Sequence, residues 1–220
     1  HGLFLPLESN HIQSERFKHQ VNASVPLKKN LWMQTVVSKI QNQKCLLQSF
    51  GFSYKRLEVL ASKVKSGDTE NMEGRAASFY WKTLFDDFKR DRFGGPPNNV
   101  LNYGYAILRA IVARALVGSG LLPTLGIHHQ NKYNAYCLAD DVMEPFRPFV
   151  DRIVLDMLGE NVDVSELSKE IKRRLLGIAE TDVIMDDKKS PLIVAASQST
   201  ASLAECFSGN SRKVKYPEYK

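Results

Sequence analysis

The sequence predicts a mainly α-helical protein with few or no strands. Apolar residues recur at the three- and four-residue intervals of a helix along most of the 220 residues, whereas the alternation of half-buried strands is nearly absent. With 43% apolar and 25% charged residues, the composition is that of a globular domain large enough to bury a sizeable core. We therefore expect one helical domain over residues 25–210.

Each expected helix rests on an apolar repeat and a signal at its end. The expected helices span residues 26–50, 54–65, 71–92, 101–117, 163–177 and 190–207, and a further helix starts around residues 135–138, is disturbed by two prolines and resumes over 149–158. Pro26 suits a first helical turn, where its missing N–H costs nothing, and Gly51 ends the first helix. Gly67 follows the second helix. The third begins near Asn71, turns its apolar residues inward and finishes in a charged segment.

Glycine, proline and asparagine interrupt the middle of the chain. Residues 93–99 contain Gly-Gly-Pro-Pro, which predicts a loop, and Asn98 or Asn99 would cap the strongly apolar helix that follows. Residues 118–133 are irregular. Two helices are therefore expected to be separated by a long loop.

The last third is expected to alternate short helices and turns. Pro145 and Pro148 disturb the helical pattern there. Residues 163–177 predict a capped amphipathic helix, and residues 182–187 predict a short strand or a turn. After the last helix, residues 211–220 form a basic tail.

Charge and cysteine content narrow the function classes. The net charge is +6, and residues 1–70 carry ten basic and five acidic side chains, which favours a polyanionic partner such as nucleic acid. We expect the longest apolar runs to be far short of a membrane span, and no charged and apolar leader opens the sequence. Neither membrane insertion nor secretion is therefore expected. Cys45, Cys137 and Cys206 are widely spaced without a CxxC pair, which disfavours disulfide or zinc scaffolds and fits the cytoplasm.

Glu73 is the first candidate functional residue. It lies in the first turn of the third expected helix, on a segment otherwise committed to packing. A carboxylate there pairs with a cation, caps the helix N-terminus or binds a metal. Capping is the simplest of the three interpretations.

A second candidate group lies within residues 125–148. Its ionisable members are His128, His129, Asp140, Asp141 and Glu144. A helix projects Asp141 and Glu144, or Asp140 and Glu144, from one face, and two anions so close need a cation between them, either a metal or an arginine such as Arg147. The alternative is a solvated acidic patch beside a structural histidine pair.

Carboxylates with a single histidine suit Mg²⁺ or Mn²⁺, which act on phosphodiesters by polarising the phosphoryl oxygen and activating a hydroxyl or water. Other chemistries lack their motifs, since the sequence contains no GxxxxGK[ST], GxGxxG, HExxH or GxSxG. Cys137 stands in an apolar setting and is expected to pack rather than to act as a nucleophile.

Three segments follow one another in a specific order: residues 71–81 (NMEGRAASFYW), residues 102–109 (NYGYAILR) and residues 125–148, which include GIHHQN and LADDVMEPFRP. Together they resemble the CRISPR-associated integrases, the endonuclease subunits that capture new spacers. The third segment is most similar to the type II branch. The resemblance covers most of the chain.

The resemblance implies a helical, metal-dependent DNA endonuclease and integrase. Its Mg²⁺ or Mn²⁺ would be held by Glu73, His129 and Glu144, with Asp141 as an additional acidic member. His129 is preferred to His128 because family members place acidic residues twelve and fifteen positions after the ligand histidine. A DNA 3′-hydroxyl would attack a phosphodiester at the edge of a CRISPR repeat and join the spacer by transesterification.

The resemblance also implies partners. These are double-stranded and partly single-stranded DNA, a small bridging Cas subunit and, in the full-length protein, a second copy of the chain, with no membrane involved. Candidate phosphate contacts are Arg16, Lys18, Lys28, Lys29, Arg75, Lys132 and Arg147. Arg147 has a structural alternative, as partner of Glu144 or Asp151.

One departure from the family pattern and two rival functions remain. Family members begin with a β-rich domain, so residues 1–24 are expected to be a linker or a remnant of that domain. The rival functions are a non-catalytic helical DNA-binding scaffold and a general DNA-repair nuclease.

Overall fold

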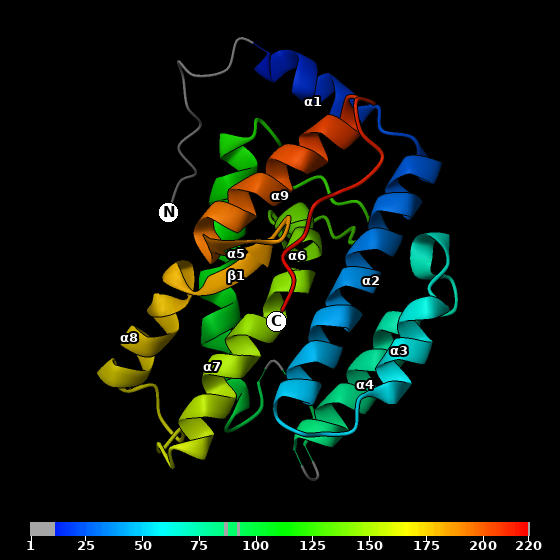
Figure 1. The fold of residues 1–220 in the computed structure, drawn as a ribbon. Helices are drawn as coiled ribbons and strands as arrows, with labels where there is room; N and C mark the ends of the chain where they lie inside the picture. Colours follow the sequence, from blue (N-terminus) through cyan, green and yellow to red (C-terminus); the bar gives the residue numbers. More distant parts are fainter. Residues whose placement is uncertain (1–11, 86–87, 92, 220) are drawn as a thin grey trace.

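The computed structural model describes residues 12–85, 88–91 and 93–219, and these residues are mainly α-helical, as predicted (Figure 1). The α-helices are α1 (Gln13–Val21), α2 (Val25–Ser49), α3 (Lys55–Ser62), α4 (Met72–Leu84), α5 (Asn98–Gly118), α6 (Cys137–Val142), α7 (Arg147–Gly159), α8 (Lys169–Leu176) and α9 (Leu192–Phe207). The shorter elements are the 3₁₀ turns η1 (Ser66–Asp68), η2 (Glu144–Phe146) and η3 (Gly177–Glu180) and the strands β1 (Asp182–Met185) and β2 (Lys188–Pro191).

The long helix α2 organises one half of the molecule, where it packs against α3, α4, α7 and η2 (Figure 1). Its N-terminus is closed by the Ser24 hydroxyl, which accepts a hydrogen bond from the Leu27 N–H at 3.3 Å. This arrangement satisfies a backbone donor that a helix otherwise leaves without a partner. Trp32, Val36 and Ile40 bury the inner face of the helix.

Helix α5 is the core of the other half, where it packs against α9, α7 and α8. A Cβ added to Gly104 would lie 2.4 Å from Val150 Cγ1 and 3.2 Å from Leu175 Cδ2, so only glycine allows this close approach. The expectation that every apolar run is too short for a membrane span is wrong for α5. Within the described residues it alone is long and apolar enough, and half of that stretch is buried inside the protein.

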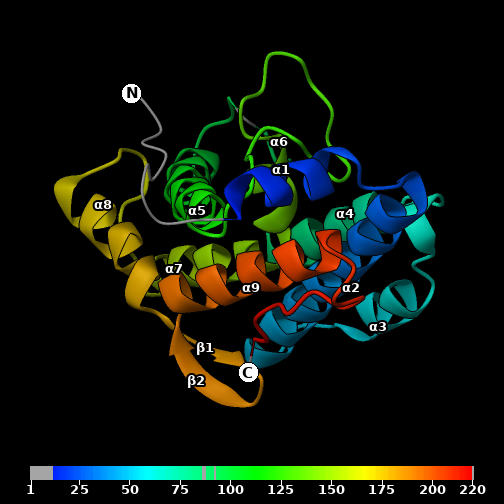
Figure 2. The same ribbon diagram turned by 90° about the horizontal axis from the view of Figure 1, so that it is seen from above.

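The strands form one antiparallel hairpin at the edge of the molecule, with Val183 opposite Ser190 (Figure 2). The C-terminal tail pairs with its outer side, because Ile184 forms a bridge with Glu218. The tail also lies along α2, where the Val214 N–H donates to Gln34 Oε1 at 2.9 Å. The short strand expected over residues 182–187 is therefore β1, and its partner β2 was not predicted.

Several helix ends differ from the prediction because of local capping. Asn98 and Asn99 lie inside α5, whose N-cap is Pro97, so neither asparagine caps it. Helix α8 is much shorter than expected, because Ser168 accepts a hydrogen bond from the Ile171 N–H and starts the helix there. Helix α4 ends at Leu84, before the charged segment, and α1 was not predicted.

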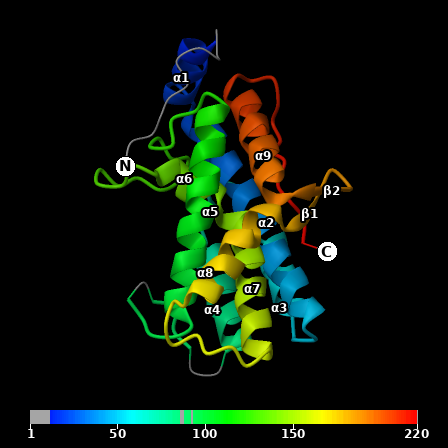
Figure 3. The ribbon, with the colours of Figure 1, turned by 90° about the vertical axis from the view of Figure 1, so that its left-hand side faces the viewer.

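The long irregular segment between α5 and α6 projects from the helical body (Figures 2 and 3). It begins at Ser119, directly after α5, and ends at Tyr136. The candidate histidines lie on this segment, so the fold presents them on a loop anchored at both ends by buried helices.

Candidate functional site

Glu73 and Glu144 converge on the ammonium group of Lys39. Its Nζ lies 2.5 Å from Glu73 Oε1 and 2.5 Å from Glu144 Oε2. The three residues come from α4, η2 and α2, and the exposed fractions of Lys39 and Glu144 are 7% and 5%. Two carboxylates far apart in the sequence thus face one buried cation.

The N-terminus of α4 is capped by residues other than Glu73. The Asp68 carboxylate accepts hydrogen bonds from the N–H groups of Met72 and Glu73, at 2.8 and 2.9 Å. The Asn71 side chain accepts another from Gly74, at 3.1 Å. The capping interpretation of Glu73 is therefore wrong, and pairing with a cation is the interpretation that the structure confirms.

Arg147 holds the other side of Glu144. Its Nε donates to Glu144 Oε1 at 2.8 Å, and its guanidinium lies 4.5 Å from the centre of the Tyr105 ring. Burial alone would raise the pKa of Glu144, but the positive charges of Arg147 and Lys39 outweigh burial and lower this pKa to about 2. Glu144 is therefore a carboxylate at any physiological pH, and the expected structural pairing of Arg147 with Glu144 is confirmed.

His129 is oriented by Asp141, which is completely buried. One Asp141 oxygen accepts the backbone N–H groups of Ile127 and His128, at 2.7 and 2.9 Å. The other accepts the His129 N–H at 3.2 Å and its ring Nδ1–H at 2.5 Å. The hydrogen bond to Asp141, opposed by partial burial, raises the pKa of His129 above its ordinary 6.5. Nε2 is then the ring nitrogen left for a ligand.

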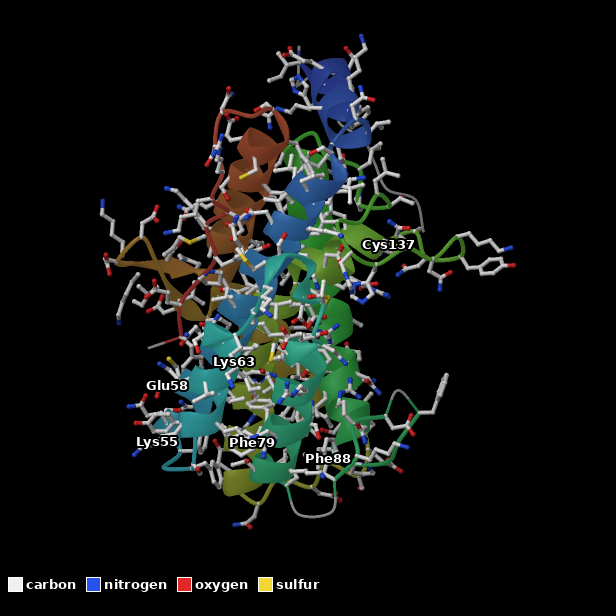
Figure 4. All side chains as sticks on the ribbon, turned by 90° about the vertical axis from the view of Figure 1, so that its right-hand side faces the viewer. Lys55, Glu58, Lys63, Phe79, Phe88 and Cys137 are labelled. Atoms are coloured by element: carbon white, nitrogen blue, oxygen red, sulfur yellow. The ribbon has the colours of Figure 1, made fainter. Side chains whose placement is uncertain are left out.

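The loop that carries His129 is held by a few specific contacts, although many of its residues are exposed. The His128 ring stacks on Trp32 of α2, with centroids 4.1 Å apart. A Cβ added to Gly126 would lie 2.3 Å from the His129 carbonyl oxygen, so glycine is required there. Cys137 is buried at the base of the loop, with Sγ 3.4 Å from the Asn134 carbonyl oxygen (Figure 4).

The predicted ligands therefore fall into two groups. Lys39 joins Glu73 to Glu144, while His129 pairs with Asp141; the part of the chain that the structure describes contains no ready-made cluster of three metal ligands. The groups are close enough to interact, because the charges of Glu144 and Glu73 also raise the pKa of His129.

Asp140 belongs to neither group. Its Oδ2 accepts a hydrogen bond from the Asn134 side chain at 2.7 Å, and its Oδ1 lies 4.0 Å from Arg109. Asp141 and Glu144 have separate partners, because the chain leaves the α-helix after Val142 and continues in the 3₁₀ turn η2. Neither pair of carboxylates expected on one helix face shares a cation.

A cavity of about 1270 Å³ opens beside the Glu144 group. Its basic lining residues are Lys39, Lys82, Lys89, Arg90, Arg109 and Arg147, and its aromatic ones are Trp81, Phe88, Phe93, Tyr105, Tyr133 and Tyr136. Phe93 and Tyr133 are almost fully exposed at 91% and 85%.

Most predicted phosphate contacts do not line this cavity, Arg147 being the exception. Arg16 donates to the Ser119 carbonyl oxygen at 2.6 Å and anchors α1, while Arg75 contacts the Met72 sulfur at 3.6 Å. Lys132 Nζ lies 4.8 Å from the centre of the Tyr133 ring. The others occupy helix surfaces: Lys18 lies on α1, and Lys28 and Lys29 begin α2.

Sequence reasoning considered Asp151 only as a partner of Arg147, whereas the structure shows it as a buried acid at the cavity wall. Asp151 accepts hydrogen bonds from the hydroxyls of Tyr80, at 2.8 Å, and Tyr105. Burial raises the pKa of Asp151 to about 6, against the opposing effect of these two hydrogen bonds. Lys39 was missed, although its place three residues after Val36, on the apolar face of its helix, could have drawn attention to it.

Comparisons with known proteins agree on one family. The family model of CRISPR associated protein Cas1 matches residues 1–176. A Neisseria meningitidis protein named CRISPR-associated endonuclease Cas1 is 37% identical over 99% of this chain and 72% of its own length. A Francisella tularensis subsp. novicida protein named CRISPR-associated endonuclease Cas1 1 is 29% identical to this chain. The match covers 66% of this chain and 53% of that protein.

Solved structures share the fold. A casposase bound to integration product has a TM-score of 0.80 and 20% identity, covering 99% of this chain and 75% of that one. A Cas1 protein from Thermotoga maritima has a TM-score of 0.73 and 18% identity, covering 95% and 75%. With these matches, the chain belongs to the Cas1 family of CRISPR-associated endonucleases.

Proposed function

We propose that this chain is the catalytic part of a divalent-metal-dependent DNA endonuclease and integrase of CRISPR adaptation. The observation that carries the proposal is the convergence of Glu73 and Glu144 on one buried cation at the wall of a large basic cavity. Carboxylates that share a divalent metal ion are a common basis of phosphodiester chemistry.

The residues present fit a divalent metal. Oxygens of Glu73 and Glu144 already reach one cation from two sides at 2.5 Å, and carboxylate oxygens are the preferred ligands of Mg²⁺ and Mn²⁺. His129 would supply Nε2 as the third ligand. A bound ion would polarise the scissile phosphoryl oxygen and make the attacking hydroxyl more acidic.

The chain's own residues prepare this site. Asp141 fixes the tautomer and orientation of His129, as a carboxylate behind a ligand histidine does. Arg147 holds one oxygen of Glu144, which restrains the direction of the other. The basic cavity wall would bind DNA phosphates, and its exposed aromatic rings would stack on unpaired bases. A DNA 3′-hydroxyl placed there would attack the repeat phosphodiester and release the adjoining 3′-oxygen.

The neighbours' names support the partners. One similar structure is a casposase bound to an integration product, and another is a Cas6-RT-Cas1–Cas2 complex. We propose accordingly that this chain binds double-stranded and partly single-stranded DNA and a small bridging Cas subunit, dimerises within the full-length protein and acts in the cytoplasm.

Mn²⁺-dependent cleavage and strand transfer test the proposal. Glu73→Gln, Glu144→Gln and His129→Ala are each expected to abolish both activities of the full-length protein while leaving its circular dichroism spectrum unchanged. Asp140→Asn is the matched control, because Asp140 neighbours Asp141 but contacts Asn134 instead, and it should retain activity. Full activity in all three variants would refute the metal site. Equal use of random duplexes and repeat junctions would instead favour a general repair nuclease.

A further inference from the structure

Lys39 occupies the position between the two carboxylates that the proposed function gives to a divalent ion. Its ammonium group lies 2.5 Å from an oxygen of each carboxylate. We propose that Lys39 is a tethered counter-ion that must leave Glu73 and Glu144 before the metal binds, and that Gln43 and a DNA phosphate then receive it. This inference rests on the proposed function.

The charges of the cluster require such an exchange. Lys39 and Arg147 balance Glu73 and Glu144, so the four groups together are neutral. A divalent ion added to these groups would leave two uncompensated positive charges in a mostly buried place, where charges interact strongly and are poorly hydrated. Lys39 and the metal therefore compete for the same oxygens.

Lys39, rather than Arg147, is the cation that the metal displaces. Arg147 contacts Oε1 of Glu144, whereas Lys39 contacts Oε2, and the Arg147 guanidinium lies over the Tyr105 ring. Arg147 is therefore beside the position that the two glutamates share. Lys39 contacts both glutamates and so occupies the shared position. Its flexible four-carbon stem also allows the ammonium group to swing without moving the helix.

The structure offers a second acceptor for the displaced ammonium group. Gln43 lies one turn further along α2, so its side chain is a near neighbour of Lys39. It is 3% exposed, and its Oε1 has no hydrogen-bond partner within the described residues. Such a buried, unsatisfied acceptor is costly, and both residues line the cavity proposed for DNA. Lys39 can thus exchange the glutamates for Gln43 and a phosphate.

This exchange would couple metal loading to DNA binding. DNA that offers Lys39 a phosphate favours the displaced state, and that state exposes the carboxylate pair to the metal. By thermodynamic linkage, bound metal must favour DNA by the same factor. The protein without DNA would then bind the metal weakly.

The first test measures Mn²⁺ binding by electron paramagnetic resonance, with metal alone and no DNA. Lys39→Met, which keeps the apolar stem, should bind Mn²⁺ at least about tenfold more tightly than the wild type, within the usual range of such couplings. Lys39→Arg keeps the charge and should bind as weakly as the wild type. Lys44→Met removes a lysine from the outer part of the same helix, where it pairs with Glu58, and should change nothing.

Adding a duplex with a single-stranded 3′ end completes the test. It should tighten Mn²⁺ binding by the wild type and have a much smaller effect on Lys39→Met. A dissociation constant for Lys39→Met within twofold of the wild type would overturn the inference, provided that Glu73→Gln and Glu144→Gln abolish binding. If Mn²⁺ binding survives both glutamine substitutions, the metal site itself is wrong, and this inference fails with it.

A thermal shift gives a second reading that does not depend on a measured affinity. Removing Lys39 leaves Glu73 and Glu144 to repel each other, so saturating Mn²⁺ should raise the melting temperature of Lys39→Met more than that of the wild type. Equal shifts in the two proteins would contradict the counter-ion role.

Discussion

Asp141 and His129 are joined twice, because one carboxylate oxygen accepts both the backbone N–H and the ring Nδ1–H of the same histidine. The buried anion therefore fixes the loop conformation and the imidazole orientation together. A histidine held in this way presents Nε2 in one direction only.

Asp141→Asn should lower the pKa of His129, because the hydrogen bond to the Asp141 carboxylate is the main cause that raises it. Nuclear magnetic resonance titration of the His129 ring measures this. Because this pKa is raised, the wild-type ring stays protonated to a higher pH than an ordinary histidine. Mn²⁺ binding should therefore increase as the pH rises through the pKa of His129, and it should begin at a lower pH in the variant. Asp140→Asn, the matched control, should leave the His129 titration in place.

Glu144→Gln should destabilise the protein by about 3 kcal/mol at pH 7, because it takes a carboxylate partner from the buried Lys39 and from the partly buried Arg147. Glu144 has a pKa of about 2 in the folded protein against an ordinary 4.5, so its contribution is complete above pH 4.5 and is lost as pH falls towards 2. Urea unfolding curves of variant and wild type should therefore converge at low pH. Glu58→Gln, on the exposed face of α3, should have little effect at any pH. A pH-independent difference would contradict the assignment.

Asp151→Asn should change stability in the opposite sense. The folded protein holds the Asp151 proton up to about pH 6, whereas the unfolded chain releases it near 3.8, so rising pH in this window favours unfolding. Asparagine has no such titration, so the variant should gain roughly 3 kcal/mol relative to the wild type between pH 4 and pH 7. Chemical denaturation at several pH values measures this. The control is Asp156→Asn, because Asp156 lies on the same helix but pairs with the exposed Arg152. If the stability of Asp151→Asn and of the wild type changed with pH in parallel, burial would not control the pKa of Asp151.

Lys82→Gln should weaken DNA binding without changing sequence preference. Lys82 is exposed at the cavity wall, where a phosphate would meet its ammonium group. Losing one phosphate contact should reduce the slope of log affinity against log salt by about 0.7 to 0.9. Fluorescence anisotropy at several salt concentrations measures the slope. Lys169→Gln on α8 is the control, since Lys169 does not line the cavity; equal effects of the two substitutions would place DNA elsewhere.

Helical periodicity was sufficient to predict the fold class, because long apolar stripes such as that of α2 report burial directly. The helix ends were harder to predict, since a cap depends on one hydrogen bond among several candidates. Ser168 rather than Asp163 starts α8, and Pro97 rather than an asparagine precedes α5. Strand β2 has the sequence Lys-Lys-Ser-Pro and no apolar alternation, whereas the equally short β1 carries Val, Ile and Met.

The candidate site, too, was only partly predictable from the sequence. Family resemblance named Glu73 and Glu144, and the structure brings them to one point. Residue patterns do not show that α2 crosses both segments, so the two glutamate partners of Lys39 could not be predicted. Asp151 was likewise considered only as a partner of Arg147, because its two tyrosine donors lie 71 and 46 residues away in the chain.

The Asn42 side chain links parts of the chain that meet only in the folded protein. Its amide donates to the Pro145 and Pro217 carbonyl oxygens, at 2.8 and 2.9 Å, and its oxygen accepts the Tyr219 N–H at 3.0 Å. Pro145 directly follows Glu144, so a single amide connects the C-terminal residues to the segment that carries Glu144. A substitution that removes the Asn42 amide would therefore release the tail from that segment.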